Sequence, residues 1–424
     1  MTGKKVTTLA KPLKAPTPAD GKFHLIKSAY ATNSLTAAVV SEQITDDDKF
    51  LIEKHVAWLG RGNISVGRQN KIAFHLVGAR RFIGEFRSNT FDDLIGGINR
   101  LKNDEVMTIA TAGRPAHPYK QNTKRDFVSI IKKFYLWMVK NNYSSILKDD
   151  IEEIKVPADD TMTKTAAQMF DEEEILAMIS ACESSMERAM IATLYEGALR
   201  IKELGTLTWG VASFTEENVV INVNVKTNKP RRIPLISAKP YLAAWKADYP
   251  YPIEANSLVF VNALHHNFNH ATITKRIRTI AKRAGVTKKI TAHIFRHSRI
   301  THMQRNGFSE QLIKIVAWAN QNTKMLATYS HLCDADVDKE MAAKYGITNQ
   351  NKIEEHVMNP RQCAHCGNVN SPTANFCGVC GLPLTAEAAL TTEQLATELQ
   401  NTALYKQIMA DVQKKLMINP VATG

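Results

Sequence analysis

The chain has 424 residues, of which 44% are hydrophobic, enough for ordinary cores and too many for a disordered chain. Lys and Arg outnumber Asp and Glu by 54 to 41, and the resulting formal charge of +13 favours an anionic partner, nucleic acid before acidic membrane. No stretch approaches the roughly 18 consecutive apolar residues of a membrane span, and no apolar segment typical of a secretory signal follows the first lysines, so we expect a cytoplasmic protein.

The first 28 residues are basic, with six lysines, one acid and three prolines. We expect residues 1–44 to form a flexible arm. Such an arm either lies along phosphates or is an ordinary disordered tail.

Residues 45–155 follow a helical pattern of apolar spacing. Four helices are expected, and each has a polar residue near its predicted start: Thr45, Ser65, Thr90 and Asn122. The pattern predicts a small all-helical domain, followed by a linker at 155–165.

From residue 165 to 347 the pattern is mixed. Residues 219–225 alternate apolar and polar side chains, and a short turn separates them from residues 231–235, which indicates a β-hairpin. Pro234 cannot donate to a ladder, so the second strand should be short or at an edge.

The segment Ala271 to Arg299 is the densest basic stretch, with nine Lys or Arg and no acid. A solvated helix face usually interleaves acids with its cations. The segment therefore favours a DNA-facing surface over an ordinary solvated face.

Four separated fragments carry residues suited to phosphodiester chemistry. Arg200 and Arg296 can each offer a planar fork of donors to a phosphate that gains charge under attack. His293 lies three residues before Arg296, so the two face the same way on a helix. The phenol of Tyr329 is a weak nucleophile at its free pKa of about 10, and nearby cations would favour its phenolate. A lysine on the hairpin, Lys226, could donate a proton to the leaving oxygen.

These fragments, taken in order, resemble the tyrosine recombinase family, which includes the phage integrases and the Xer-type recombinases. Residues 197–204 read Gly-x-x-Arg-x-x-Glu-Leu, similar to the family's first arginine box. Residues 226–235 are similar to its β-hairpin lysine motif, and 293–298 to its His-x-x-Arg box. Residues 327–331, Ala-Thr-Tyr-Ser-His, are similar to its nucleophile box. The resemblance covers roughly residues 165–335.

The resemblance implies a mainly α fold with a small antiparallel β-sheet. It implies a helical core-binding (SAM-like) DNA-binding domain at 45–155 and a mixed α+β catalytic domain at 165–347. The implied catalytic residues are Arg200, Lys226, His293, Arg296, Trp318 and Tyr329.

The implied mechanism begins with attack of Tyr329 on the scissile phosphate. The tyrosine stays joined as a 3′-phosphotyrosine, Lys226 protonates the leaving 5′-oxygen, and Arg200 and Arg296 clamp the phosphate. His293 has acid/base and positioning roles. No ATP or catalytic metal is expected, and the resemblance implies a homotetramer on two double-stranded DNA sites.

Two positions remain open. The family usually has Leu-Gly-His about nine or ten residues before the tyrosine, where this chain has Val316-Ala-Trp-Ala-Asn320. Trp318, whose indole N–H could donate to phosphate, is preferred, and Asn320 is the alternative. Lys229 is the alternative to Lys226. Glu203 is expected to hold the shape of the site by pairing with an arginine rather than to react.

Two Cys-x-x-Cys pairs near the end of the sequence indicate a zinc ribbon over 360–385. Four thiolates at this spacing suit tetrahedral zinc, and a glycine after each pair allows a tight turn. The predicted ligands are Cys363, Cys366, Cys377 and Cys380. With four protein ligands the zinc would be structural. A C-terminal helical tail, 386–424, with one or two amphipathic helices, should pack on a neighbouring subunit or on the same chain.

The preferred function is a site-specific DNA recombinase, either an integrase of a mobile element or a resolvase of chromosome dimers. A type IB-like topoisomerase would use the same chemistry without pairing two sites. A zinc-ribbon DNA-binding regulator that has lost catalysis is a rival of another class. A basic RNA-binding protein is a further rival, for which the sequence shows no RNA-binding motif.

Overall fold

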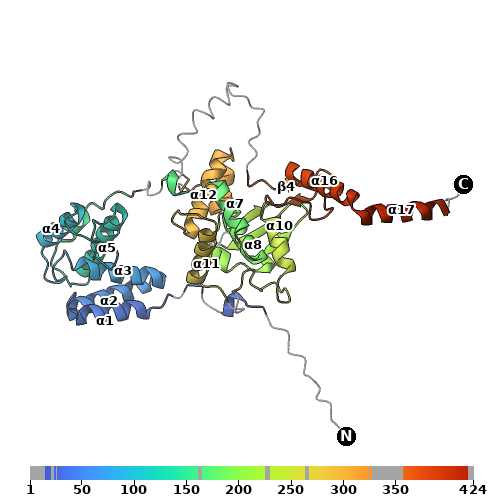
Figure 1. Ribbon diagram of the computed structural model, residues 1–424. Coiled ribbons are helices and arrows are strands. Elements are labelled where there is room, and N and C mark those ends of the chain that lie inside the picture. The colour runs from blue at the N-terminus through green and yellow to red at the C-terminus, as the bar shows by residue number, and fades with distance from the viewer. Residues whose placement is uncertain are drawn as a thin grey trace, which may run out of the picture. The chain divides into compact units, whose positions relative to one another are not determined.

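The computed structural model describes residues 15–20, 23–24, 26–160, 165–224, 230–262, 267–323, 325–326 and 357–418. The chain divides into two compact units (Figure 1). The helical unit comprises His24–Thr163. The second unit comprises Met1–Phe23 together with Lys164–Gly424, and we call it the catalytic unit because it contains the segment expected to be catalytic. Among the residues described, no helix combines the length and the apolar character needed to cross a bilayer.

The helical unit is built from α-helices around one apolar core. The helices are α1 (Ala29–Val40), α2 (Asp46–Gly60), α3 (Val66–Ala79), α4 (Phe91–Lys102), α5 (Gln121–Lys140) and α6 (Lys148–Glu153). The long helix α5 turns Phe127, Ile131 and Phe134 inward. Packing of this amphipathic face, more than helix propensity, stabilises the unit.

Sequence capping signals set two helix starts in this unit. Thr45 and Asp48 form a reciprocal capping box at α2, and Thr90 and Asp93 form another at α4, as their spacing predicts. Asp48 is also buried, and its carboxylate accepts from Arg80 Nε at 2.6 Å and from the backbone N–H of Phe86 at 3.0 Å. One residue therefore caps a helix and ties two later segments to it.

The predicted flexible arm over 1–44 is wrong for the residues that the structure describes there. Residues 29–40 form α1, whose Leu35 is buried in the core of the helical unit. Phe23 is buried in the catalytic unit, and the carbonyl of Pro16 accepts from the backbone N–H of Leu258 at 2.9 Å. Phe23 and Leu35 anchor this basic segment, because each is buried in the core of one of the two units.

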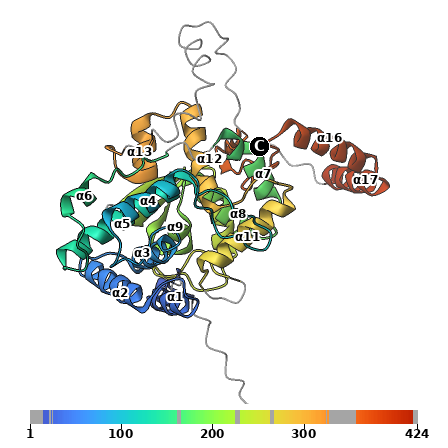
Figure 2. The same ribbon diagram turned by 90° about the vertical axis from the view of Figure 1, so that its left-hand side faces the viewer.

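The catalytic unit is mainly helical with a three-stranded sheet. Its helices are α7 (Glu172–Ser180), α8 (Ser185–Glu196), α9 (Ile201–Gly205), α10 (Lys239–Ala247), α11 (His270–Arg283), α12 (Ala292–Arg305) and α13 (Glu310–Trp318). Short 3-10 turns occupy Pro18–Asp20, Ala166–Gln168 and Trp209–Val211. The helix α8 packs against α10 and α12, and α12 lies beside α13 (Figure 2). This arrangement confirms the predicted fold class.

The sheet is antiparallel in the order β1 (Ala212–Phe214), β2 (Val219–Asn224) and β3 (Pro230–Leu235). The β2–β3 hairpin is the predicted one, with Ile221 opposite Ile233. The strand with Pro234 lies at the edge, as expected. After it, the buried carboxylate of Glu196 accepts from three successive backbone N–H groups at 236–238, at 2.7–3.1 Å. This cluster directs the chain from β3 into α10.

The C-terminal segment holds a small two-stranded ladder and two helices. The ladder pairs β4 (Arg361–Gln362) with β5 (Val369–Asn370), and the helices are α16 (Ala386–Asn401) and α17 (Ala403–Ile418) (red in Figure 1). The helical tail thus contains two helices.

Candidate functional site

A strained turn presents Arg200 at the start of α9. Ala198 has a φ of 44°, a left-handed conformation that side chains other than glycine rarely adopt and that is concentrated at functional sites. The backbone N–H of Arg200 donates to Glu203 Oε2 at 2.8 Å, and its Nη1 donates to Oε1 at 2.7 Å. The Arg200 side chain keeps 37% of its surface exposed. Glu203 therefore holds a cation in place at the surface, the role expected for it.

Beneath Glu203 lies a second arginine, Arg231 of β3, which is fully buried. Its Nη2 donates to Glu203 Oε2 at 2.6 Å, and its Nη1 donates to the carbonyls of Val316 and Ala317 at 2.9 and 2.7 Å. Burial lowers the pKa of Arg231 to about 10, and Glu203 partly offsets that effect. The guanidinium is therefore still charged at neutral pH, and it joins α9 to the end of α13.

Arg231 was not identified from the sequence, although it lies within the hairpin motif at 226–235. A signal was present in the strand register. Arg231 alternates with Ile233 and Leu235 on the buried face of β3. An arginine in the apolar register of a strand must find buried partners, because an unpaired buried charge is costly.

Arg296 of α12 completes the same network. It is only 3% exposed, and its Nη1 and Nη2 donate to the carbonyls of Ala198 and Ala317, each at 2.5 Å. Its guanidinium also lies 5.4 Å from the centre of the Trp318 ring. Arg296 thus supports the turn that presents Arg200. For Arg296 to contact a phosphate, that phosphate must reach a buried guanidinium that already donates to backbone carbonyls.

His293 and Trp318 are the two other described candidates, on α12 and α13. His293 lies one turn before Arg296 on α12 and is exposed. Trp318 is the last residue of α13, which ends because Ala319 adopts a left-handed φ of 52°. The alternative residue, Asn320, uses its side-chain oxygen to accept from the backbone N–H of Asn322 at 3.0 Å. The structure therefore places Trp318 against Arg296 and engages Asn320 in a local turn.

The nucleophile candidate Tyr329 and both lysine candidates, Lys226 and Lys229, lie outside the described residues. The structure brings together Arg200, Arg296 and Trp318 through one hydrogen-bonded and stacked network. The roles of Tyr329, Lys226 and Lys229 remain predictions from the sequence.

The basic segment Ala271 to Arg299 is not a uniform DNA-facing surface, which corrects the sequence interpretation. Arg276 and Arg283 donate to the buried carboxylate of Glu187 at 2.8 and 2.6 Å. Lys288 donates to Glu174 at 2.5 Å. The acids missing from the segment come from α7 and α8. A separate group of cations on α11 is exposed, with no described carboxylate within 4.0 Å: Lys275, Arg278 and Lys282.

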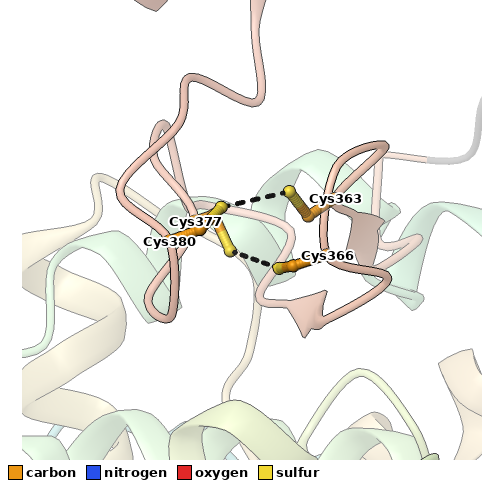
Figure 3. A group of neighbouring side chains, drawn as sticks. All are labelled: Cys363, Cys366, Cys377 and Cys380. Atoms are coloured by element: carbon orange, nitrogen blue, oxygen red, sulfur yellow. Dashed lines mark hydrogen bonds between the residues drawn. The ribbon is translucent and has the colours of Figure 1, made fainter. Parts of the chain in front are cut away.

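The four predicted metal ligands converge (Figure 3). The Sγ atoms of Cys363 and Cys380 are 3.6 Å apart, those of Cys366 and Cys377 are 3.5 Å apart, and all four lie within 4.8 Å of one another. Four thiolates around zinc at about 2.3 Å stand about 3.8 Å apart in a tetrahedron. The donor set and spacing therefore fit zinc. His365 is exposed and outside the group.

Two equivalent turns shape this cluster. The N–H of Gly367 donates to the carbonyl of Cys363, and the N–H of Gly381 to that of Cys377, each at 2.9 Å. Both glycines have a φ near +72°, the conformation for which glycine was expected. Backbone N–H groups of Cys380 and Val379 lower the pKa of Cys377 to about 6. The turns thus favour the thiolate that a metal needs.

The segment that carries the four cysteines, residues 357–384, is called here the cysteine module. It contacts the α10 region of the catalytic unit. The hydroxyls of Tyr241 and Thr373 are 2.9 Å apart, and Ser237 Oγ donates to the carbonyl of Met358 at 2.9 Å. Met358 is buried in the catalytic core.

Cys182, unlike the four clustered cysteines, is an ordinary packed thiol. Burial raises its pKa to about 12.

The chain is similar to several known proteins. Transposase A from transposon Tn554 of Staphylococcus aureus is 28% identical over 181 residues, 39% of this chain and 49% of that protein, so the chain spans about half the length of that curated relative. A tyrosine recombinase of Thermosipho africanus is 26% identical over 254 residues, 59% of this chain and 85% of that protein. A crystal structure of a lambda integrase dimer bound to a COC′ core site matches with a TM-score of 0.51 and 12% identity, covering 67% of this chain and 77% of that one.

The family model described as the phage integrase family matches residues 168–335. These residues include every arginine and carboxylate of the network around Glu203. The domain that residues 168–335 form therefore belongs to the phage integrase family of tyrosine recombinases.

Proposed function

We propose that the protein is a site-specific DNA recombinase that breaks and rejoins strands through a phosphotyrosine. One observation carries the proposal. Glu203 holds Arg200 at the surface, and the buried Arg231 holds Glu203 in turn. A cation fixed before the substrate arrives can stabilise the charge that develops on an attacked phosphate without reorganising.

The proposed reaction uses the phenol of Tyr329 as nucleophile. Its hydroxyl gives its proton to a base, the role proposed for His293, as its oxygen attacks phosphorus; a 3′-phosphotyrosyl bond forms, and the bond to the 5′-oxygen breaks. Lys226 supplies a proton to that leaving oxygen. The 5′-hydroxyl of a partner strand then attacks the phosphotyrosine and releases Tyr329, so the number of phosphodiester bonds is conserved.

The surrounding residues have graded roles in this proposal. Arg200 is partly exposed and His293 is exposed, and in this proposal both contact the phosphate directly. Arg296 supports Arg200 through the Ala198 carbonyl, and a phosphate would have to reach its buried guanidinium to accept from it. Trp318 packs its ring against Arg296, and its indole N–H is proposed as a further donor to the phosphate.

A trapping experiment tests the nucleophile. A nicked DNA substrate that loses a short strand after cleavage should accumulate a covalent adduct with the wild-type chain on a denaturing gel. Tyr329→Phe should give no adduct and unchanged DNA affinity. The matched control is Tyr30→Phe, an exposed tyrosine of the helical unit, which should cleave normally. An adduct from Tyr329→Phe removes the assignment.

The general acid is tested with a substrate in which sulfur replaces the leaving 5′-oxygen, because a thiolate leaves without a proton. Lys226→Ala should slow cleavage of the oxygen substrate far more than that of the sulfur substrate. Lys229→Ala should slow both substrates equally. If the two variants exchange these patterns, Lys229 is the acid.

Double-stranded DNA is the proposed partner, and the exposed cations of α11 form part of the proposed contact. Lys275, Arg278 and Lys282 recur at i, i+3 and i+7, opposite the buried Ile273 and Ile277. Each phosphate contact adds about −0.9 to the slope of log affinity against log salt, so replacing all three by Gln should flatten the slope by about 2.7. An unchanged slope would remove this face from the interface.

We further propose that the four cysteines hold a structural zinc. All four positions of a tetrahedral ion would be taken by Cys363, Cys366, Cys377 and Cys380, which leaves none for a substrate. The ion would hold the cysteine segment, which contacts the α10 region, in its folded form.

We also propose that four copies assemble on two DNA sites, since exchange between duplexes needs two cleaved sites. The mass of the complex formed with two-site DNA tests this number.

A further inference from the structure

The helices α16 and α17 carry apolar side chains that neither core buries. On α16, Leu395 and Leu399 lie one turn apart with exposed fractions of 55% and 60%. On α17, apolar residues follow one face, four residues apart or beside one another: Leu404, Tyr405, Ile408, Met409 and Val412. Their exposed fractions run from 37% to 67%. A contiguous apolar face of this kind marks an interaction site.

The two helices cannot cover each other within one chain. Only Thr402 separates α16 from α17, and its backbone is extended, with a ψ of 144°. Two helices that fold back on each other need a connection of about 2–5 residues. A single extended residue keeps the two apolar faces from meeting along their length, so the cover comes from elsewhere.

The charges of the two helices identify a self-complementary partner. The helix α16 carries three glutamates and no Lys, Arg, His or Asp, which gives it a charge of −3. The helix α17 carries three lysines and one aspartate, which gives +2. Pairing α16 with α16 would oppose like charges, whereas pairing α16 of one copy with α17 of another opposes unlike charges. A two-fold axis repeats that contact twice.

We propose that α16 and α17 form a docking surface for a second copy of this chain. The helix α16 of each copy packs its leucines against the apolar face of α17 of the other. The segment lies outside residues 168–335, and the contact depends on neither DNA nor strand cleavage. The apolar faces provide the affinity, and the opposed charges select the α16–α17 pairing over like pairs.

Charge reversal in the full-length chain tests the pairing. The acidic-helix variant is Glu393→Lys with Glu398→Lys, and the basic-helix variant is Lys406→Glu with Lys414→Glu. In sedimentation equilibrium without DNA, the wild type should associate, and each variant alone should associate at least tenfold more weakly. An equimolar mixture of the two variants should recover the wild-type affinity as a heterodimer, because each reversed helix then meets its opposite.

A chain that carries all four reversals is the matched control. Its composition equals that of the wild type, and it should associate like the wild type, which separates lost pairing from lost folding. Leu399→Ser with Ile408→Ser should abolish association whatever the charges. The proposal is overturned if the DNA-free wild type is monomeric, if either variant alone associates as tightly as the wild type, or if the mixture fails to recover affinity.

Discussion

Neutralising Glu203 should destabilise the catalytic unit by several kcal/mol. The carboxylate is 9% exposed and accepts three hydrogen bonds, two from Arg200 and one from the fully buried Arg231. In Glu203→Gln the shape is kept, but Arg231 becomes a buried cation without a counter-charge. Breaking one partner of a buried ion pair typically costs about 3–5 kcal/mol, and we expect about 4 kcal/mol here.

A double-mutant cycle isolates that interaction. Arg231→Met removes the buried cation, so Glu203→Gln should cost about 2 kcal/mol less in the Arg231→Met background than in the wild type. The assay is urea unfolding, monitored by hydrogen exchange of the backbone amides in β2 and β3, because these amides report on the catalytic unit alone. The matched control is Glu310→Gln, which breaks the exposed pair with Lys314 and should cost less than about 0.5 kcal/mol. If Glu203→Gln stays within about 1 kcal/mol of the wild type, or if the two changes are additive, the buried network does not stabilise the site as argued.

Three further outcomes are expected. Burial lowers the pKa of His302 to about 4, so this imidazole binds a proton more readily in the unfolded chain than in the folded one. Its contribution to stability is therefore complete above about pH 6.5 and falls by up to about 3 kcal/mol as the pH drops towards 4. His302→Gln should remove this loss of stability, as measured by urea unfolding at pH 7 and pH 5. Asp48→Asn should destabilise the helical unit by about 3 kcal/mol, since Arg80 then lacks its partner; an unchanged urea midpoint for that unit contradicts this. Cys377→Ser should remove one zinc per chain by mass spectrometry and raise hydrogen exchange over 361–384, whereas Cys182→Ser should keep both at wild-type values.

Much of the local structure could be predicted from the sequence. The polar residues Thr45 and Thr90 mark two helix starts, and alternation over 219–225 marks the central strand. The glycines after the Cys-x-x-Cys pairs predict the turns at Gly367 and Gly381. Each of these features depends on residues within a few positions of one another. Short-range geometry is carried by the sequence itself, so these predictions needed no knowledge of the fold.

The candidate site could be predicted from the sequence only in part. The order of the motifs selects Arg200, His293 and Arg296, and the structure shows that Arg296 is buried and supports the turn before Arg200. The buried Arg231 gains its role from carbonyls 85 and 86 residues away, at the end of α13.

The basic segment and the N-terminal arm show the same limit. Arg283 is neutralised by Glu187, 96 residues earlier, so its charge could not be assigned to DNA or to folding from the segment alone. Phe23 enters a core formed mostly by residues beyond 168. The sequence by itself determined which residue types and local elements this protein has. Tertiary structure decided which charges are satisfied within the protein and which remain for a partner, because the groups that satisfy them are distant in sequence and meet only when the chain folds.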